Sequence, residues 1–360
     1  MYRFPIALLR FSRTFYLQQN NSPLIQGCGC IQTRLRSTVS PNQPSNKIRK
    51  YVFSRFLEFV QNYSAKLESK FPSAIRTYRV FTDGMKDFYS DMKAFLRIAK
   101  KVRKSKIGTA CLTRKEIEIF HQMPRDMKKV APLLVLSTLP LTNYIILPLV
   151  FCFPRQLLCT HFWTLQQRFE FATQVHRQRL YNYRPVFRAL QEQIDGENLQ
   201  KNPLQESWRV ALDCLGSGTH PTPEEILKFL PLFSGSPYSL LQIYSGHVQG
   251  LTALLRMHGM HVGFRRRKRL ADRAQMIHCM DQAIIREGGP ESMTYEELRL
   301  ACFIRGLNPA NMKTEDIVEW LQDWLTVSQE VDKNSWSLLL HCPILLGYNQ
   351  PSNWSLLKHP

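Results

Sequence analysis

Residues 294–325 read TYEELRLACFIRGLNPANMKTEDIVEWLQDWL and predict two helices joined by a short extended loop. Thr294 and Glu297 have the spacing of a capping box, which begins a helix, and Gly306 is a typical residue to end one. After the loop GLNPANMK, apolar side chains recur at spacings of three and four, namely Ile317, Trp320, Leu321, Trp324 and Leu325. This recurrence has the period of an amphipathic helix, so we expect a helix over residues 314–326.

A similar pattern recurs through the C-terminal half of the chain. LTALLRMHGM (251–260) and LRLACFIRGL (298–307) both place a leucine eight residues before a glycine. Each unit is therefore expected to be a short helix that ends at a glycine cap, Gly259 and Gly306 respectively. Capping pairs predict further helix starts at Thr164 with Gln167 and at Thr222 with Glu225. No stretch alternates with the period of a strand, so we predict an all-α fold with a helical domain over residues 155–360.

One dense basic cluster lies within this half, in the stretch FRRRKRL (264–270). Its cations are Arg265, Arg266, Arg267, Lys268 and Arg269. Successive cations can neutralise phosphates, which makes binding dependent on salt, so the cluster is a candidate ribosome- or phosphate-binding surface. The alternatives are a solvated helix start between Phe264 and Leu270, or a nuclear-localisation signal.

Residues 130–153 form a run of 24 uncharged residues, and about 20 are enough to cross the hydrocarbon core of a bilayer. Pro140 and Pro148 lie inside the run with Asn143 between them. Proline kinks a helix because it removes a backbone hydrogen bond, and membrane helices tolerate such kinks. We predict one proline-kinked transmembrane helix. The alternative is a broken helix whose free carbonyls and Asn143 line an ion path in an oligomer.

The region over residues 47–129 is predicted to be basic and helical, and apolar residues repeat through 75–102 at heptad-like spacing. This pattern is typical of a coiled-coil seam, through which the chain would contact a second copy or a protein partner. It is equally typical of a long helix that packs on the protein's own core. Thr113 and Glu116 then predict the start of another helix.

Residues 1–46 have the composition of a mitochondrial targeting leader. Their arginines are interspersed with apolar residues, serines follow, and the first acidic residue of the chain is Glu58. Arginine-rich, serine-containing and acid-free segments are typical of mitochondrial import signals, and a basic tail without structure is the alternative. Residues 1–129 carry 26 basic and 8 acidic side chains, against 22 and 20 in the remainder. Most of the net charge of +20 therefore lies ahead of the apolar run.

The sequence contains no motif that indicates catalysis or a bound cofactor. A Walker loop, a GxSxG elbow, an HExxH motif and an EF-hand loop are all missing. His247, His258 and His261 are near one another, but no cysteine or carboxylate completes a metal site around them. The nine cysteines include no CxxC pair, which does not favour a zinc site or a disulfide framework. We predict no enzymatic activity, cofactor, metal or small-molecule substrate.

Three stretches resemble the LETM family, which is named for leucine zipper, EF hand and transmembrane segment. They are LTRKEIEIF (112–120), the proline-rich run closing in FPRQLLCTHFWT (153–164), and EELRLACFIRGL with TEDIVEWLQDWL and SLLLH (296–341). An EF hand and long C-terminal coiled coils are missing, so the chain resembles a short member of the family. The resemblance therefore does not imply calcium regulation.

The resemblance implies a mitochondrial inner-membrane protein whose helical C-terminal domain is ribosome-binding-like, faces the matrix and supports the respiratory chain. The outer membrane is the alternative location. Longer members are associated with cation/proton exchange, so an exchange component is a second hypothesis, and a membrane scaffold for protein complexes is a third. The positive-inside rule conflicts with the implied topology, because five basic residues precede the apolar run closely and only two follow it. The expected partners are the mitochondrial ribosome and membrane lipid.

Overall fold

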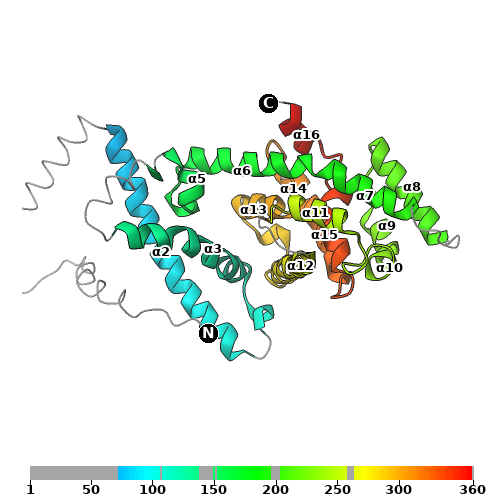
Figure 1. Cartoon of the computed structure of the whole chain (residues 1–360), viewed down its shortest axis with the longest axis horizontal. Helices are drawn as coiled ribbons and strands as arrows, with labels where there is room; N and C mark the ends of the chain where they lie inside the picture. Colours follow the sequence, from blue (N-terminus) through cyan, green and yellow to red (C-terminus); the bar gives the residue numbers. More distant parts are fainter. Residues whose placement is uncertain are drawn as a thin grey trace, which may run out of the picture. The chain divides into compact units, whose positions relative to one another are not determined.

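The computed structural model describes residues 72–105, 108–137, 149–150, 152–195, 203–257 and 263–358. The first part contains α2 (Pro72–Lys104), η2 (Gly108–Cys111), α3 (Arg114–Ser137), α5 (Pro154–Leu157), η3 (Thr160–Phe162), α6 (Leu165–Tyr181) and α7 (Tyr183–Asp195), where η denotes a 3₁₀ turn. The second part contains α8 (Pro203–Ser217), α9 (Pro223–Lys228), α10 (Leu230–Ser234), α11 (Ser245–Leu254), α12 (Gly263–Arg286), η4 (Pro290–Ser292), α13 (Tyr295–Arg305), α14 (Thr314–Glu330), α15 (Trp336–Leu345) and α16 (Pro351–Lys358) (Figure 1). The predicted all-α class is confirmed for the described residues, which contain no strand. The predicted leader over 1–46 and the residues up to 71 lie outside them.

Four predicted helix starts are confirmed by capping hydrogen bonds. At α6 the Thr164 N–H donates to Gln167 Oε1 (3.1 Å), and the Gln167 N–H donates to Thr164 Oγ1 (3.2 Å). Each such pair satisfies N–H groups that have no acceptor within the helix. The other starts are Thr113–Glu116 at α3, Thr222–Glu225 at α9 and Thr294–Glu297 at α13.

The two predicted glycine caps have different outcomes. α13 ends at Gly306 in the left-handed conformation (φ 98°), as expected. α11 ends at Leu254, well before Gly259, which lies outside the described residues. Here Arg256 takes the left-handed position (φ 53°), and the N–H of the next residue donates to the carbonyl of Thr252 (2.9 Å). The helix end predicted at Gly259 is therefore wrong, because a non-glycine residue closes this turn.

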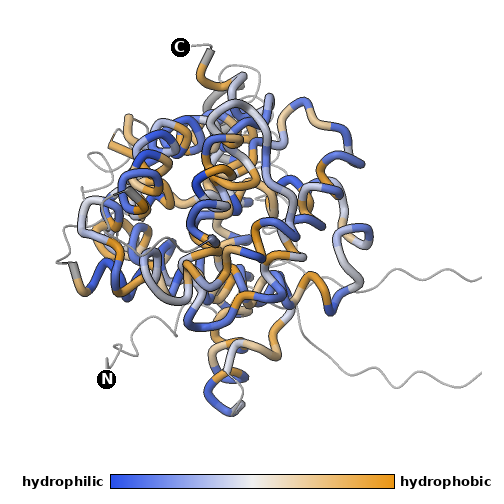
Figure 2. Tube along the Cα trace, turned by 90° about the vertical axis from the view of Figure 1, so that its right-hand side faces the viewer, coloured by the Kyte–Doolittle hydropathy of each residue, from blue (hydrophilic) through white to orange (hydrophobic). Residues whose placement is uncertain are grey.

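The core of the described fold is built around α12, which contacts α3, α11, α14 and α15. Leu270, Ala274 and Ile277 bury one face of α12, at the spacing of helical turns. α15 is buried along nearly its whole length, because it contacts α10, α12 and α14. Consistent with this burial, it carries no Asp, Glu, Lys or Arg. Figure 2 shows hydrophobic and hydrophilic residues alternating along the helices, as expected where each helix turns one face to a shared core.

A buried ion pair joins the helix–loop–helix unit of α13 and α14 to α12. The side chains of Asp281 and Arg305 are closed to solvent, and Arg305 Nε donates to Asp281 Oδ1 (2.9 Å). The second carboxylate oxygen accepts hydrogen bonds from Trp324 Nε1 (3.1 Å) and Ser328 Oγ (2.5 Å). These bonds offset the cost of burying the two charges.

The heptad-like stripe of residues 75–102 lies on α2 and packs within the chain. Phe88 is 6% exposed and belongs to a buried cluster with Met123 and Phe162, and Met92 and Phe95 of the stripe pack against the same cluster. The middle of the stripe therefore follows the second interpretation, in which the long helix packs on the protein's own core.

The predicted transmembrane segment, residues 130–153, is described only near its two ends. Residues 130–137 complete α3, and Pro140, Asn143 and Pro148 lie outside the described residues. Among the helices that the structure describes, none is both long enough and apolar enough to cross a membrane.

The two flanks of this segment are in contact with each other. Gln122 of α3 donates from Nε2 to Thr160 Oγ1 of η3 (3.1 Å). Met123 shares a buried cluster with Leu158 and Phe162. A helix that crosses a bilayer once would separate its flanks by about 30 Å of hydrocarbon. The described residues therefore do not show the predicted single crossing, and in them the two flanks of the segment contact each other.

Candidate functional site

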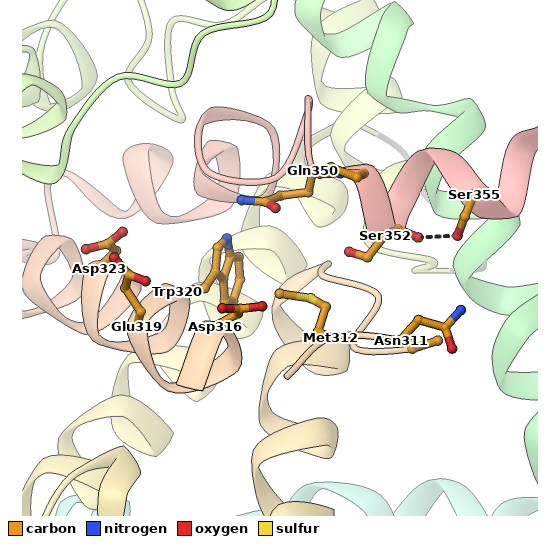
Figure 3. Close-up of a pocket in the computed structure, with 11 residues that line it drawn as sticks. Asn311, Met312, Asp316, Glu319, Trp320, Asp323, Gln350, Ser352 and Ser355 are labelled. Carbon is orange, nitrogen blue, oxygen red and sulfur yellow. Dashed lines mark hydrogen bonds between the residues drawn. The ribbon is translucent and has the colours of Figure 1, made fainter. Parts of the chain in front are cut away.

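An acidic cavity of about 620 Å³ lies between α14 and the start of α16 (Figure 3). Asp316, Glu319 and Asp323 line it from α14, next to Trp320. Burial, and then the charge of Glu319, raise the pKa of Asp323. Three carboxylates on one face repel anions, so this cavity suits a cationic group and not a phosphate.

A second cavity, of about 430 Å³, lies between α2, α3, η3 and α13. Glu118, Gln122 and Asp126 line it from successive turns of α3, because residues four apart share one face of a helix. Asp91 of α2 and His161 of η3 complete this polar part of the wall. The cavity thus gathers acidic, amide and imidazole groups from segments that are distant in sequence.

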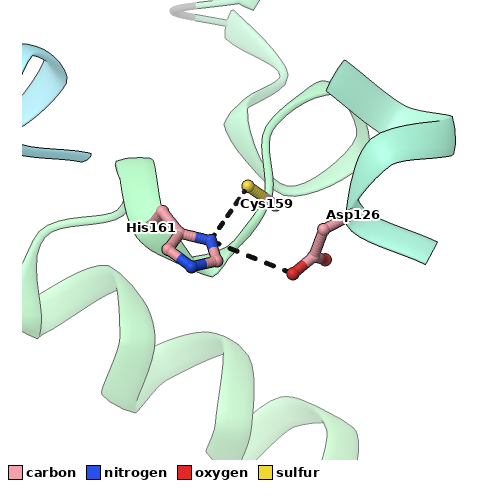
Figure 4. A group of neighbouring side chains, drawn as sticks. All are labelled: Asp126, Cys159 and His161. Atoms are coloured by element: carbon pink, nitrogen blue, oxygen red, sulfur yellow. Dashed lines mark hydrogen bonds and ion pairs between the residues drawn. The ribbon is translucent and has the colours of Figure 1, made fainter. Parts of the chain in front are cut away.

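His161 contacts both Cys159 and Asp126 (Figure 4). Its Nε2 atom is 2.9 Å from Asp91 Oδ2. Its Nδ1 atom is 3.3 Å from Cys159 Sγ and 3.9 Å from Asp126 Oδ2. The imidazole therefore bridges one carboxylate on α2 and a thiol–carboxylate pair on its other side.

Close packing of α2 against η3 positions His161. A Cβ atom on Gly84 would lie 2.4 Å from the backbone oxygen of His161, so only glycine fits at this approach. The Phe88 ring packs edge-on against the imidazole, with centroids 5.8 Å apart. Phe162, next in the chain, is buried beneath the turn. The ring is thereby held by apolar contacts as well as by hydrogen bonds.

The electrostatics of this group do not favour nucleophilic catalysis. Cys159, His161 and Asp91 are connected as in a cysteine hydrolase, where a base activates the thiol. Burial and then the charge of Asp126 raise the pKa of Cys159 to about 11, and its side chain is 1% exposed. An attacking cysteine needs a lowered pKa and an accessible sulfur. Burial also raises the pKa of Asp126.

The opposite wall of the cavity ties the start of α3 to α13. Arg114 Nη2 and Lys115 Nζ lie 2.7 and 2.9 Å from Glu297 Oε1. The hydrogen bond from Lys115, the cap bond from Thr294 and the charge of Arg114 lower the pKa of Glu297 to about 2. This carboxylate therefore stays ionised at neutral pH and serves both as a helix cap and as an ion-pair partner.

Residues 112–345 match the protein family described as "LETM1-like, RBD", a range that contains α3 to α15 entire. This chain belongs to the LETM1-like family. The LETM1 domain-containing protein 1 of Xenopus tropicalis is 31% identical over 311 residues, covering 86% of this chain and 88% of that protein. Proteins of the same name from Homo sapiens and Bos taurus are 29% identical over 317 and 313 residues, covering 86% of each chain. The resemblance inferred from the sequence is confirmed, and the LETM1-like family is a non-enzymatic one.

Within this LETM1-like domain, the predicted basic cluster forms the first turns of α12. Arg265 and Lys268 are exposed, and Arg266 is half-buried. Arg267 donates from Nε and Nη2 to two backbone carbonyls of the loop before α11 (3.0 and 2.8 Å). Arg269 is half-buried and also interacts within the protein. Arg265 and Lys268 of the cluster thus face solvent, whereas Arg267 stabilises the loop before α11 through its hydrogen bonds.

The predicted membrane-kink residues lie outside the described part of the LETM1-like domain, as do His258 and His261. His247 instead contacts His341, with the two Nε2 atoms 2.8 Å apart. Burial lowers the pKa of His247 to about 2 and that of His341 to about 4. The pair is therefore a neutral contact of the core.

Sequence reasoning missed the group around His161. The only local signal is the Cys-x-His spacing at residues 159–161, within the stretch that carries the LETM resemblance. Its carboxylates, Asp91 and Asp126, come from two other helices. A search for cysteine and histidine two residues apart could have identified half of the group, but its partners depend on how α2 and α3 pack.

Proposed function

We propose that this chain is a mitochondrial membrane protein whose C-terminal domain binds mitochondrial ribosomes and thereby supports respiratory-chain function. The observation that carries the proposal is the match to the LETM1-like ribosome-binding domain family over residues 112–345. The arginine-rich, acid-free composition of residues 1–46 supports import into mitochondria.

The phosphate-binding surface in this proposal is the exposed part of the basic cluster. Arg265, Arg266 and Lys268 lie on the first turns of α12, where the helix dipole adds a positive potential. Arg267 is excluded from this role, because its guanidinium bonds to loop carbonyls. The acidic cavity on α14 would repel RNA phosphates because of its negative charge. The exposed cations of α12 are therefore the preferred surface for ribosomal RNA.

Ribosome binding is tested with the triple variant Arg265→Gln, Arg266→Gln and Lys268→Gln in salt-dependent co-sedimentation with mitochondrial ribosomes. Loss of three phosphate contacts should weaken binding by about 10-fold or more and reduce the salt slope by roughly 2. The matched control removes the same charge from the exposed residues Arg168, Arg184 and Arg188 of α6 and α7. Unchanged binding by the α12 variant, or an equal loss in the control, contradicts the proposal.

The proposed membrane segment is the uncharged run of residues 130–153. Its flanks touch at Gln122 and Thr160, which supports a segment that enters and leaves the inner membrane on one side. Such a topology removes the conflict found in the sequence. The basic N-terminal flank and the ribosome-binding domain then both face the matrix, as the positive-inside rule and the family resemblance separately require.

Topology is tested with one cysteine introduced at a time at the exposed positions Arg125 and Gln166. The starting variant has serine in place of Cys28 and Cys30 and of the four exposed or half-buried cysteines, Cys111, Cys152, Cys214 and Cys279. An impermeant maleimide should label neither site in mitoplasts and both after detergent is added. Labelling of one site alone in mitoplasts shows that the chain crosses once, and labelling of both places the domain outside the matrix.

A further inference from the structure

Asp126, Cys159 and His161 present three different ligand atoms to one small volume. The carboxylate oxygen, the thiol sulfur and the imidazole Nδ1 all lie within 4.8 Å of one another. Asp126 is 7% exposed and Cys159 is 1% exposed, and the His161 side chain is 11% exposed. The three atoms converge from α3 and from the turn η3 (Figure 4).

The separations suit a tetrahedral metal ion. At the tetrahedral angle, bonds of about 2.0 Å to nitrogen or oxygen and 2.3 Å to sulfur place neighbouring ligand atoms about 3.3–3.5 Å apart. The Nδ1–Sγ distance is 3.3 Å and the Nδ1–Oδ2 distance is 3.9 Å. To hold an ion, the Asp126 carboxylate must therefore move about 0.6 Å closer to Nδ1, and all three ligand atoms already lie within 4.8 Å of one another.

The surrounding hydrogen bonds are those of a metal site. A ligating histidine normally donates its second ring N–H to a carboxylate, which fixes the tautomer and directs the other nitrogen at the metal. Asp91 Oδ2 lies 2.9 Å from His161 Nε2, and therefore directs Nδ1 toward Cys159 and Asp126. Gln122 Nε2 donates to Asp126 Oδ2 (3.2 Å) and orients that carboxylate in the same way.

The charge and the ligand types indicate which ion would bind. One carboxylate and one thiolate carry two negative charges. Burying these charges without a counter-ion would cost free energy, and a divalent ion neutralises them. A mixed sulfur, nitrogen and oxygen set is typical of zinc and does not suit calcium or magnesium. Asp126 and His161 also line the 430 Å³ cavity, so a fourth position is open to water or an external ligand.

We propose that Asp126, Cys159 and His161 bind a divalent transition-metal ion of the zinc class, with Asp91 as the residue that orients His161. On binding, the Cys159 thiol releases its proton to solvent and coordinates as the thiolate. The ion joins α3 to η3, and these elements flank residues 130–153. It therefore acts as a clip that closes the two flanks of that segment against each other.

The test is a titration of the purified full-length protein with Co²⁺, which reports on zinc-type sites by absorbance. We expect one equivalent to produce visible ligand-field bands and a near-ultraviolet thiolate charge-transfer band, and Zn²⁺ to displace both. Cys159→Ser should remove the charge-transfer band. Asp91→Asn should keep the band but weaken the affinity by about 10- to 100-fold. The matched control Cys214→Ser, at an exposed cysteine of α8, should change neither.

A second variant separates loss of a ligand from loss of the fold. His161→Gln retains hydrogen-bonding capacity but removes the imidazole, and its helical circular dichroism without metal should equal that of the native protein. Loss of Co²⁺ binding in this folded variant supports the site. Absence of a stoichiometric complex in the native protein overturns the proposal. So does a charge-transfer band that survives in Cys159→Ser or His161→Gln.

Discussion

The ion pair of Asp281 and Arg305 is closed to solvent, and neutralising its carboxylate is expected to destabilise the protein strongly. Asp281→Asn preserves the shape of the side chain but leaves the Arg305 guanidinium without a counter-charge at a position where both side chains are 0% exposed. It also replaces one carboxylate oxygen with an amide N–H₂ group, which cannot accept a hydrogen bond. The oxygen that is lost is the acceptor either for Arg305 or for Trp324 and Ser328.

The magnitude follows from the burial of the pair. Removing one partner of a buried ion pair costs about 3–5 kcal/mol, because the other charge remains desolvated. A loss of about 4 kcal/mol is a large part of the roughly 5–15 kcal/mol by which domains are stable. With an m-value of about 1–3 kcal/mol/M, the urea midpoint should fall by more than about 1 M.

The assay is urea unfolding of the purified protein, followed by helical circular dichroism and tryptophan fluorescence. The matched control is Asp83→Asn in the exposed pair of Asp83 with Lys86, whose side chains are 68% and 72% exposed. That change should stay within about 0.5 kcal/mol, because water screens an exposed pair. The control separates the effect of burial from that of the substitution itself.

A double variant then tests whether the unpaired charge causes the loss. Asp281→Asn combined with Arg305→Met removes both charges, and should recover at least about 2 kcal/mol of the loss caused by Asp281→Asn alone. If Asp281→Asn costs less than about 1 kcal/mol, or the double variant is no more stable than the single one, the reasoning is refuted.

Three further perturbations follow from local geometry and from titration. Gly84→Ala should cost about 2 kcal/mol or more in urea unfolding, because its Cβ would lie 2.4 Å from a backbone oxygen of η3; native stability would show that α2 and η3 are not in close contact. Gly306→Ala should cost about 2 kcal/mol or more in the same assay, because φ is 98° and the Cβ would lie 2.9 Å from two side-chain atoms; a neutral result would argue against the left-handed cap. Burial lowers the pKa of His176 and of His341 to about 4 in the folded protein. Because the unfolded chain takes up these protons first, as it does at His247, the free energy of unfolding should fall by several kcal/mol as the pH drops from about 6.5 toward 4. A pH-independent urea midpoint across that range would contradict their neutral burial.

Much of the secondary structure could be predicted from the sequence, because its signals are local. The capping pair of Thr164 with Gln167 is only three residues apart, and its hydrogen bonds form wherever the helix begins. Gly306 likewise ends α13 through its own backbone conformation. The error at Gly259 has the same origin, because a glycine favours the left-handed cap but does not prevent Arg256 from adopting it earlier.

The sequence by itself thus determined the helical class, four helix starts, the amphipathic face of α14 and the family. Only the tertiary structure decided which distant side chains meet. Gly84 lets α2 approach η3, and this approach brings Asp91 to His161. α3 brings Asp126 to the same ring and holds the two flanks of residues 130–153 together. Such contacts depend on how whole helices pack against each other, and no spacing along the chain encodes that packing directly.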